Sequence, residues 1–181
     1  MRIIAGKHKG LILKDFEYLG IRPTLDRVRE SIFNIIQFDI NGAEVLDLFG
    51  GTGAVSLEFL SRGATVTTGD ISDDALNLIK QNYKKAKETP NLIKGDYKET
   101  LKKLYGKKYD YIYLDPPFAT DFGSIAIKFI SKYQLLNEDG IIIYEHVKDK
   151  PFELPEGMYI VDTRTYGITQ VEFIKERVCI R

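Results

Sequence analysis

Cysteine is almost absent from this sequence, and long apolar runs are absent altogether. The 181 residues include one cysteine, Cys179, so the chain cannot form an internal disulfide, and no Cys/His spacing typical of a metal site occurs. No stretch approaches the roughly 18 uninterrupted apolar residues that cross a membrane, and the N-terminus lacks the apolar segment of a secretory signal. We therefore expect a cytoplasmic protein that has no disulfide, no membrane anchor and no bound metal.

The chain also lacks an excess of charge of either sign. Lys and Arg number 26, and so do Asp and Glu, so the bulk charge gives no indication of a nucleic-acid partner. The first 30 residues are locally basic, with 7 Lys and Arg against 4 Asp and Glu. So small an excess is compatible with a basic docking surface, and equally with an ordinary solvated surface.

The pattern of apolar residues predicts one α/β domain, which the length and the 44% hydrophobic content also fit. From residue 44 onward, short apolar segments alternate with helical periodicity, which predicts a parallel sheet covered by helices on both faces. Near the end, 158–161 and 170–174 flank a turn with no helix between them, which predicts an antiparallel hairpin. The other expected strands span 45–48, 64–68, 91–93, 109–114 and 140–145, and the expected helices span 53–62, 73–87, 97–104 and 123–133.

A basic hairpin and a helix are expected before this alternating region. Residues 2–5 and 10–14 are short apolar segments, and the turn between them contains two glycines, which admit positive φ. Apolar residues then recur at helical spacing as far as about Phe38, and Thr24 is placed to cap the start of this helix.

Glycines at the end of the first sheet strand indicate a ligand that approaches the backbone closely. Gly51 and Gly53 follow the segment 45–48, with Phe49 between, and stand before a helix. Asp70 follows Gly51 by 19 residues, the separation expected of an acid that binds ribose hydroxyls. Turn geometry alone would also explain the glycines, and Asp70 could instead cap the next helix.

The acidic residues near this turn indicate which cofactor it binds. Asp96 follows the third strand, where it could accept a hydrogen bond from an adenine amino group, with Tyr97 walling the ring, although a simple turn would look the same. A nicotinamide dinucleotide carries a pyrophosphate, whereas S-adenosylmethionine carries a sulfonium and an ammonium. A pocket with Asp47, Asp70 and Asp96 and no P-loop Lys favours the cationic cofactor.

The most specific motif is Asp115-Pro116-Pro117-Phe118, which directly follows the segment 109–114. Its prolines remove backbone donors and fix φ, so the carbonyls of this corner remain rigid acceptors. An exocyclic base amine could donate to the Asp115 carboxylate and to the Pro116 carbonyl, which would aim its lone pair at a methyl donor. Phe118 would stack on the extruded base. The alternative is a proline-rich loop with a core phenylalanine.

Together these segments resemble the class I Rossmann-like methyltransferases with an (Asp/Asn)-Pro-Pro-(Tyr/Phe) motif, and more closely the bacterial 16S ribosomal RNA guanine-N2 methyltransferases. The N-terminal hairpin and Arg22-Pro23-Thr24 single out this family within the wider class. The resemblance implies a Rossmann-like, seven-stranded, mostly parallel sheet with an antiparallel C-terminal hairpin. It covers nearly the whole chain and rests on residues 1–7, 9–10, 22–24, 26–30, 45–49, 51–54, 60–64, 115–118, 136–140 and 166–167.

The same resemblance implies a division of roles within the single domain 1–181. Residues 1–40 would bind RNA, and residues 41–181 would form the catalytic core that binds S-adenosylmethionine. The cofactor residues would be Asp47, Phe49, Gly51, Gly53, Asp70, Ile71, Asp96 and Tyr97; the residues at the base would be Asp115, Pro116 and Phe118; and the residues at RNA phosphates would be Lys7, Lys9, Arg22, Thr24, Arg27 and Arg29.

The leading hypothesis is therefore a monomeric enzyme that methylates the exocyclic N2 of a guanine in 16S ribosomal RNA, either free or in an assembling small subunit. Within the same chemistry, the acceptor could be an adenine N6 in DNA or RNA, or a glutamine of a protein. Asp115 in place of Asn favours RNA guanine. Outside this chemistry, the glycine turn would also suit a nucleotide-binding module without catalysis or an NAD-dependent reductase.

Overall fold

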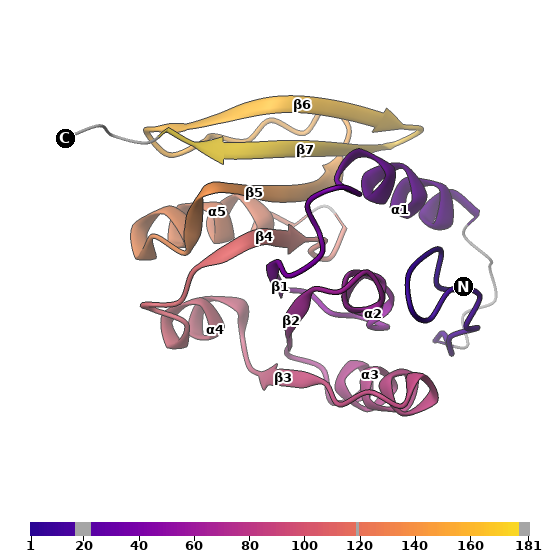
Figure 1. The fold of residues 1–181 in the computed structure, drawn as a ribbon. Coiled ribbons are helices and arrows are strands. Elements are labelled where there is room, and N and C mark those ends of the chain that lie inside the picture. The colour runs from indigo at the N-terminus through magenta and orange to yellow at the C-terminus, as the bar shows by residue number, and fades with distance from the viewer. Residues whose placement is uncertain (17–22, 119, 178–181) are drawn as a thin grey trace.

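The computed structural model describes residues 1–16, 23–118 and 120–177, and only the backbone of residues 23–25 (Figure 1). Within these ranges no helix has the length and apolar character needed to span a membrane. The helices are α1 (Pro23–Ile35), α2 (Ala54–Ser61), α3 (Asp73–Ala86), α4 (Tyr97–Lys103) and α5 (Phe122–Tyr133). The strands are β1 (Glu44–Asp47), β2 (Thr65–Asp70), β3 (Asn91–Lys94), β4 (Tyr109–Leu114), β5 (Leu136–Val147), β6 (Met158–Tyr166) and β7 (Thr169–Glu176).

These strands form one mixed sheet in the order β3-β2-β1-β4-β5-β7-β6. Strands β1 to β5 run parallel, and β7 pairs antiparallel with both β5 and β6. The predicted Rossmann-like sheet with an antiparallel C-terminal hairpin is thereby confirmed. From β1, the chain first builds outward through β2 and β3 and then returns to place β4 on the other side of β1. Folds of this kind bind ligands in the crevice outside the carboxyl ends of the strands at such a reversal.

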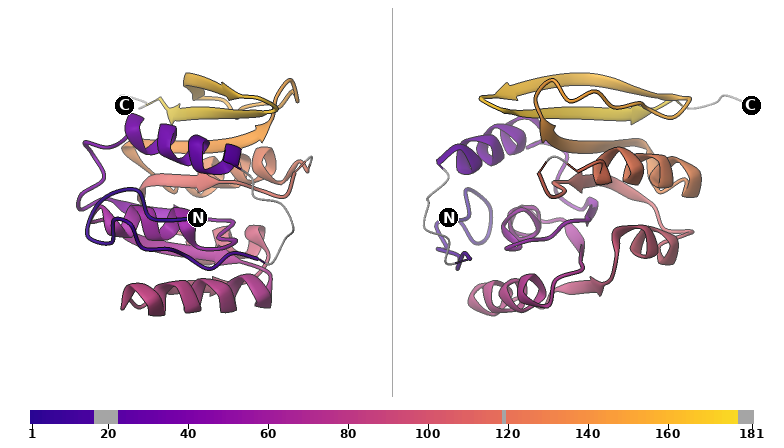
Figure 2. Two further views of the ribbon diagram at one scale, coloured as in Figure 1. Left: turned by 90° about the vertical axis from the view of Figure 1, so that its right-hand side faces the viewer. Right: turned by 180° about the vertical axis from the view of Figure 1, so that it is seen from behind.

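Helices cover both faces of the sheet (Figures 1 and 2). Helices α4 and α5 lie on one face, and α1, α2 and α3 lie on the other. Neighbouring residues of a strand point into opposite layers: Leu46 packs with the α4 and α5 side chains, whereas Val45 packs with those of α1 and α2. Because both faces are buried, the central strands are apolar along most of their length.

The N-terminal segment is a hairpin-like loop rather than the predicted pair of regular strands. Among the described residues of this segment, Arg2 and Ile12 form an isolated antiparallel bridge. The next amides of the first segment do not donate to a strand. The amides of Ile4 and Ala5 donate to the buried Glu58 carboxylate of helix α2, at 2.7 and 3.1 Å. The predicted pairing is present, since the Ile3 amide donates to the Leu11 carbonyl at 3.0 Å and the Leu13 amide to the Met1 carbonyl at 3.1 Å. It is shorter than predicted because Glu58 of α2 accepts the next two amides of the first segment.

Several element boundaries also differ from those predicted. Helix α1 begins at Pro23, so Thr24 lies inside its first turn and does not cap it, in keeping with the preference for proline at the first helical position. The helix ends at Ile35 instead of Phe38, whose side chain is 87% exposed and gains no packing from a longer helix. Strand β5 is longer than predicted because it pairs with β4 on one side and with β7 on the other.

The turn of the N-terminal segment is constrained by its contact with α2, which a pair of glycine variants can test. Gly6 has a φ of +80°, and a Cβ there would lie 1.9 Å from the Ser61 carbonyl oxygen; Gly10 has a φ of +85° with nothing within 4 Å. Both Gly6→Ala and Gly10→Ala incur left-handed strain of roughly 1–2 kcal/mol. We expect Gly6→Ala to destabilise the protein further, because it also displaces the segment from α2. Urea unfolding of both variants measures the difference, and equal losses would contradict the constraint.

Candidate active site

Close backbone packing shapes the glycine turn after β1. The Gly50 amide donates to the Gly69 carbonyl of β2 at 2.8 Å, and the Gly53 amide donates to the Gly50 carbonyl at 2.8 Å. Gly53 precedes α2 with a φ of 78°, and a Cβ there would lie 3.1 Å from Ile79 of α3. The geometry of the turn thus requires glycine whether or not a ligand is bound, and the missing side chains also let a ligand approach the backbone.

Asp70 ties the end of β2 to the glycine turn. Its carboxylate accepts the Gly51 amide at 2.9 Å and the Ser72 amide at 2.8 Å. The cap of α3 is Ser72, whose side chain accepts from the Ala75 amide, so Asp70 is not the helix cap. Each Asp70 oxygen retains a lone pair that can accept from a ribose hydroxyl. Ile71 beside it is 66% exposed, as a residue that contacts an adenosine has to be.

Aromatic rings pack together next to Asp96. Asp96 caps α4 by accepting the Lys98 amide at 2.9 Å. Tyr97 is buried, and its ring contacts those of Phe49 and Phe122 at centroid distances of 5.6 and 5.1 Å. Tyr97 is therefore part of the core beneath this edge of the sheet. Of the two rings, that of Phe122, at the start of α5, is the more exposed to solvent. The sequence analysis missed Phe122, whose one signal was its position soon after the proline corner.

Asp47, at the carboxyl end of β1, belongs to a group of acids. It is buried, the Ser56 hydroxyl donates to one of its oxygens at 2.6 Å, and its Oδ1 has no partner among the described residues. Burial, together with the charges of Asp115 and Asp70, raises the pKa of Asp47 to about 7 in spite of the Ser56 hydrogen bond. In the described part of the chain, no His, Cys, Asp or Glu side chains are arranged to hold a metal ion. The group favours an organic cation.

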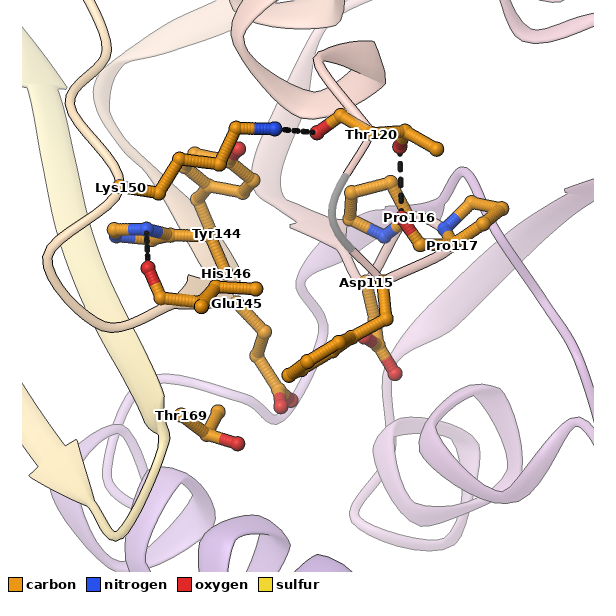
Figure 3. Close-up of a pocket in the computed structure, with 11 residues that line it drawn as sticks. Asp115, Pro116, Pro117, Thr120, Tyr144, Glu145, His146, Lys150 and Thr169 are labelled. Atoms are coloured by element: carbon orange, nitrogen blue, oxygen red, sulfur yellow. Dashed lines mark hydrogen bonds between the residues drawn. The ribbon is translucent and has the colours of Figure 1, made fainter.

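A cavity of about 280 Å³ opens beside the proline corner that follows β4 (Figure 3). Asp115 and Phe118 are exposed along its wall, whereas Pro116 is buried. The Thr120 hydroxyl donates to the carbonyl of the second proline at 2.7 Å, and the Lys150 ammonium donates to the Thr120 carbonyl at 2.9 Å. These bonds hold the corner to the loop after β5. The structure thus places Asp115, Pro116 and Phe118 together along one cavity.

Two buried side chains at the end of β5 also line this cavity, and neither was predicted. The Glu145 carboxyl accepts a hydrogen bond from the Tyr113 hydroxyl of β4, and burial, with the charge of Asp47, raises its pKa to about 7. The His146 ring stacks on that of Tyr144 at a centroid distance of 4.8 Å. The available signal was a pair of polar residues directly after the apolar run 141–144.

The basic residues predicted to contact RNA phosphates differ in how far they are exposed to solvent. Lys7, Lys9 and Arg27 are exposed, and Lys7 pairs with Glu88 at 2.8 Å. Arg22 lies outside the described residues, and so does the side chain of Thr24. Exposed cations therefore stand on the N-terminal segment and the start of α1, alongside the exposed acids Asp26 and Glu30.

Arg29 departs from this group because its side chain is turned inward. It is 5% exposed, and its guanidinium donates to the Arg2 carbonyl at 2.6 Å and to Asp26 at 3.1 Å. Burial lowers the pKa of Arg29, against the opposing effect of the Asp26 charge. The prediction of a phosphate contact is corrected accordingly: Arg29 fastens α1 to the N-terminal segment.

The strand order and the site at its carboxyl edge define a Rossmann-like methyltransferase. The chain belongs to the family described as "Conserved hypothetical protein 95", whose sequence model matches residues 1–175. It is 37% identical to "Putative rRNA methyltransferase YlbH" of Bacillus subtilis, over 98% of this chain and 100% of that protein. It is 34% identical to "Ribosomal RNA small subunit methyltransferase D" of Haemophilus influenzae, over 93% of this chain and 90% of that protein.

Solved structures agree with this assignment. The fold is similar to that of a putative methyltransferase, yhhF, from Escherichia coli, with a TM-score of 0.87, 25% identity and coverage of 99% of both chains. It is also similar to the putative methylase HI0767 from Haemophilus influenzae, with a TM-score of 0.83, 31% identity and coverage of 98% of both chains. The family that the sequence resembles is thus confirmed.

The burial of Asp47 predicts how stability depends on pH. Because its pKa is about 7 in the folded protein and near 3.8 ordinarily, the folded state retains a proton that the unfolded chain releases between these values. The free energy of unfolding therefore falls as the pH rises through this range. In Asp47→Asn this contribution is absent, so from pH 5 to pH 8 the variant should gain about 2 kcal/mol relative to the wild type. Urea unfolding at pH 5 and pH 8 measures the gain, and Asp74→Asn, a change at an exposed carboxyl, is the control. If the stability of Asp47→Asn and that of the wild type changed equally with pH, the raised pKa of Asp47 would be contradicted.

Proposed function

We propose that this chain transfers a methyl group from S-adenosylmethionine to the exocyclic N2 of a guanine in 16S ribosomal RNA. Its family and its relatives make it an S-adenosylmethionine-dependent methyltransferase of ribosomal RNA. The finer assignment rests on one observation: Asp115 lines a cavity at the end of β4, and its charge also acts on Asp47 at the end of the neighbouring strand β1. We further propose that residues 1–40 dock the RNA and residues 41–181 carry out the chemistry.

The residues around the glycine turn fit a cationic cofactor. Asp47 has a buried oxygen without a partner among the described residues, and its neighbours Asp70 and Asp115 add like charge that a cation would relieve. Asp70 would accept from the ribose hydroxyls, and Asp96 from the adenine amino group. When bound, S-adenosylmethionine supplies an electrophilic methyl group on a sulfonium.

The proline corner orients and activates the acceptor amine. An exocyclic amine is a poor nucleophile because its lone pair is delocalised into the ring. The Asp115 carboxylate and the Pro116 carbonyl each accept one N–H, which shifts electron density to nitrogen and directs the lone pair along the line of transfer. Asp115 is exposed at the cavity wall, so it can take up the released proton and pass it to solvent.

Phe118 provides a surface on which the target base can stack. Its side chain is 58% exposed at the cavity, although large apolar side chains are usually buried in the core. Extrusion of a base costs roughly a few kcal/mol, and stacking on an aromatic ring returns on the order of 1–3 kcal/mol. An exposed ring next to the acceptor groups therefore supports the entry of a nucleobase.

A labelled-substrate assay with a matched pair of variants tests this function. Wild-type protein and methyl-labelled cofactor are incubated with hypomethylated small subunits, bare 16S RNA, DNA and bulk protein, and the products are digested to nucleosides or amino acids. We expect the label as N2-methylguanosine of 16S RNA. Asp115→Ala should reduce turnover by at least about 100-fold while cofactor affinity changes by less than about tenfold, because this residue contacts the acceptor.

Asp139→Ala is the control, since its side chain is 99% exposed, away from the cavity, and it should leave turnover unchanged. Label in adenine N6 or in a glutamine would contradict the guanine assignment. A large loss of cofactor binding in Asp115→Ala would contradict the role given to Asp115.

The docking role of the N-terminal segment has a separate test. Lys9→Ala and Arg27→Ala should each weaken RNA binding and reduce the slope of log affinity against log salt by roughly one unit, since each removes one phosphate contact. Lys132→Ala, an exposed change on α5 at the opposite face of the sheet, should leave the slope unchanged. Equal slopes for all three variants and the wild type would make Lys9 and Arg27 ordinary solvated residues.

A further inference from the structure

A second carboxyl group faces the acceptor cavity and has no role in the mechanism above. Glu145 follows Tyr144 of β5, which pairs with Leu114 of β4, and Asp115 follows Leu114. The two acids therefore stand at the ends of adjacent parallel strands. Figure 3 shows both carboxyl groups directed toward the same side of the cavity.

A hydroxyl group from the neighbouring strand holds the Glu145 side chain in place. Its side chain is buried, with 6% exposure, and the buried Tyr113 hydroxyl donates to its Oε1. The hydrogen bonds of the described residues include none to Oε2, and the residue lines the cavity. A buried carboxyl with a single hydroxyl partner destabilises the fold. Such groups are characteristic of sites that bind a ligand with complementary donors.

The nucleobases differ in what they would present to this carboxylate. A purine whose N2 amine lies against Asp115 and Pro116 places its N1 next along the same edge. In guanine, N1 carries a hydrogen and donates; in adenine and in 2-aminopurine, N1 is an acceptor. A carboxylate only accepts, so it attracts the guanine edge and repels the others. An enzyme that extrudes a base reads this edge by hydrogen bonds.

We propose that Glu145 is the residue that selects guanine, by accepting the N1–H of the base whose N2 amine is held by Asp115 and Pro116. This inference rests on the proposed function and adds the determinant of base choice. Tyr113 is then a positioning residue, because its hydroxyl fixes the direction of the Glu145 carboxyl. A site built around a buried acceptor discriminates strongly against an analogue that lacks the matching donor.

The test changes both partners of the proposed hydrogen bond. In the RNA, 2-aminopurine replaces guanine and turns the N1 donor into an acceptor; in the protein, Glu145→Gln supplies a donor in place of the carboxylate. The guanine that the wild type methylates is located by mass spectrometry of its product. It is then replaced by 2-aminopurine through splinted ligation into the same RNA, free or assembled, whichever the wild type accepts. At pH 8, above the pKa of about 7, Glu145 is mostly ionised. The measured quantity is kcat/KM for guanine divided by kcat/KM for 2-aminopurine.

In Glu145→Gln, the amide can donate to the unprotonated N1 of 2-aminopurine, so this ratio should fall by on the order of 100-fold relative to the wild type. Glu138→Gln is the control: it makes the same change at an exposed position near the other end of β5, and Glu138 does not line the cavity. Its ratio should equal that of the wild type. Calorimetric binding of S-adenosylhomocysteine and thermal unfolding establish that each variant is folded.

The outcomes separate the two proposals. If the wild type methylates no guanine of 16S RNA, the proposed function fails. If it does and Glu145→Gln keeps the wild-type ratio, the selection by Glu145 is wrong and its role is structural. Should Glu145→Gln not fold, Tyr113→Phe replaces it: the loss of the orienting hydroxyl should lower the ratio by about tenfold. An unchanged ratio in Tyr113→Phe would then overturn the proposal.

Discussion

The adjacency of β1 and β4 is the constraint on which the rest of the site depends. Since the chain returns across the sheet at this point, the glycine turn after β1 and the proline corner after β4 emerge side by side at one edge. Neither motif could form the site alone, because one has no acceptor for a base and the other has no turn for a cofactor. Parallel pairing in register, with Asp47 opposite Tyr113 and the Leu48 amide donating to the Tyr113 carbonyl at 3.1 Å, fixes their separation.

Because β2, β1, β4 and β5 are neighbours, four acidic side chains lie close together at this edge: Asp47, Asp70, Asp115 and Glu145. Asp115 and Asp70 raise the pKa of Asp47, and Asp47 in turn raises that of Glu145. Like charges held this close reduce stability, and burial increases the effect. The arrangement is consistent with a site that gains its compensating charge from a bound cation and its compensating donors from a bound base. The unbound protein would thus be less stable at this edge of the sheet, and the binding of a cation and a base would remove the unfavourable interactions.

The sequence predicted the parts of the site that depend on local geometry. The glycine turn, Asp70 and the proline corner have fixed spacing relative to strands, so their positions follow once the alternation is recognised. Glu145 and Phe122 were missed because their positions depend on tertiary packing: Glu145 on the pairing of β4 with β5, and Phe122 on the contact of α5 with Tyr97 of α4. Arg29 was misassigned for a related reason: a basic residue on a helix is expected to be solvated, and only the packing of the N-terminal segment buries it.

Helix α2 links the cofactor turn to the proposed RNA-docking segment. It begins directly after Gly53, and roughly 6 to 11 Å further along it the Glu58 carboxylate and the Ser61 hydroxyl hold the backbone of residues 4–8. Arg62 pairs with Glu58 at 2.8 Å and keeps this buried acid compensated. Because one short helix carries both attachments, the basic segment has a fixed position relative to the glycine turn. Under the proposed function, RNA bound to this segment would meet the catalytic edge in a defined orientation.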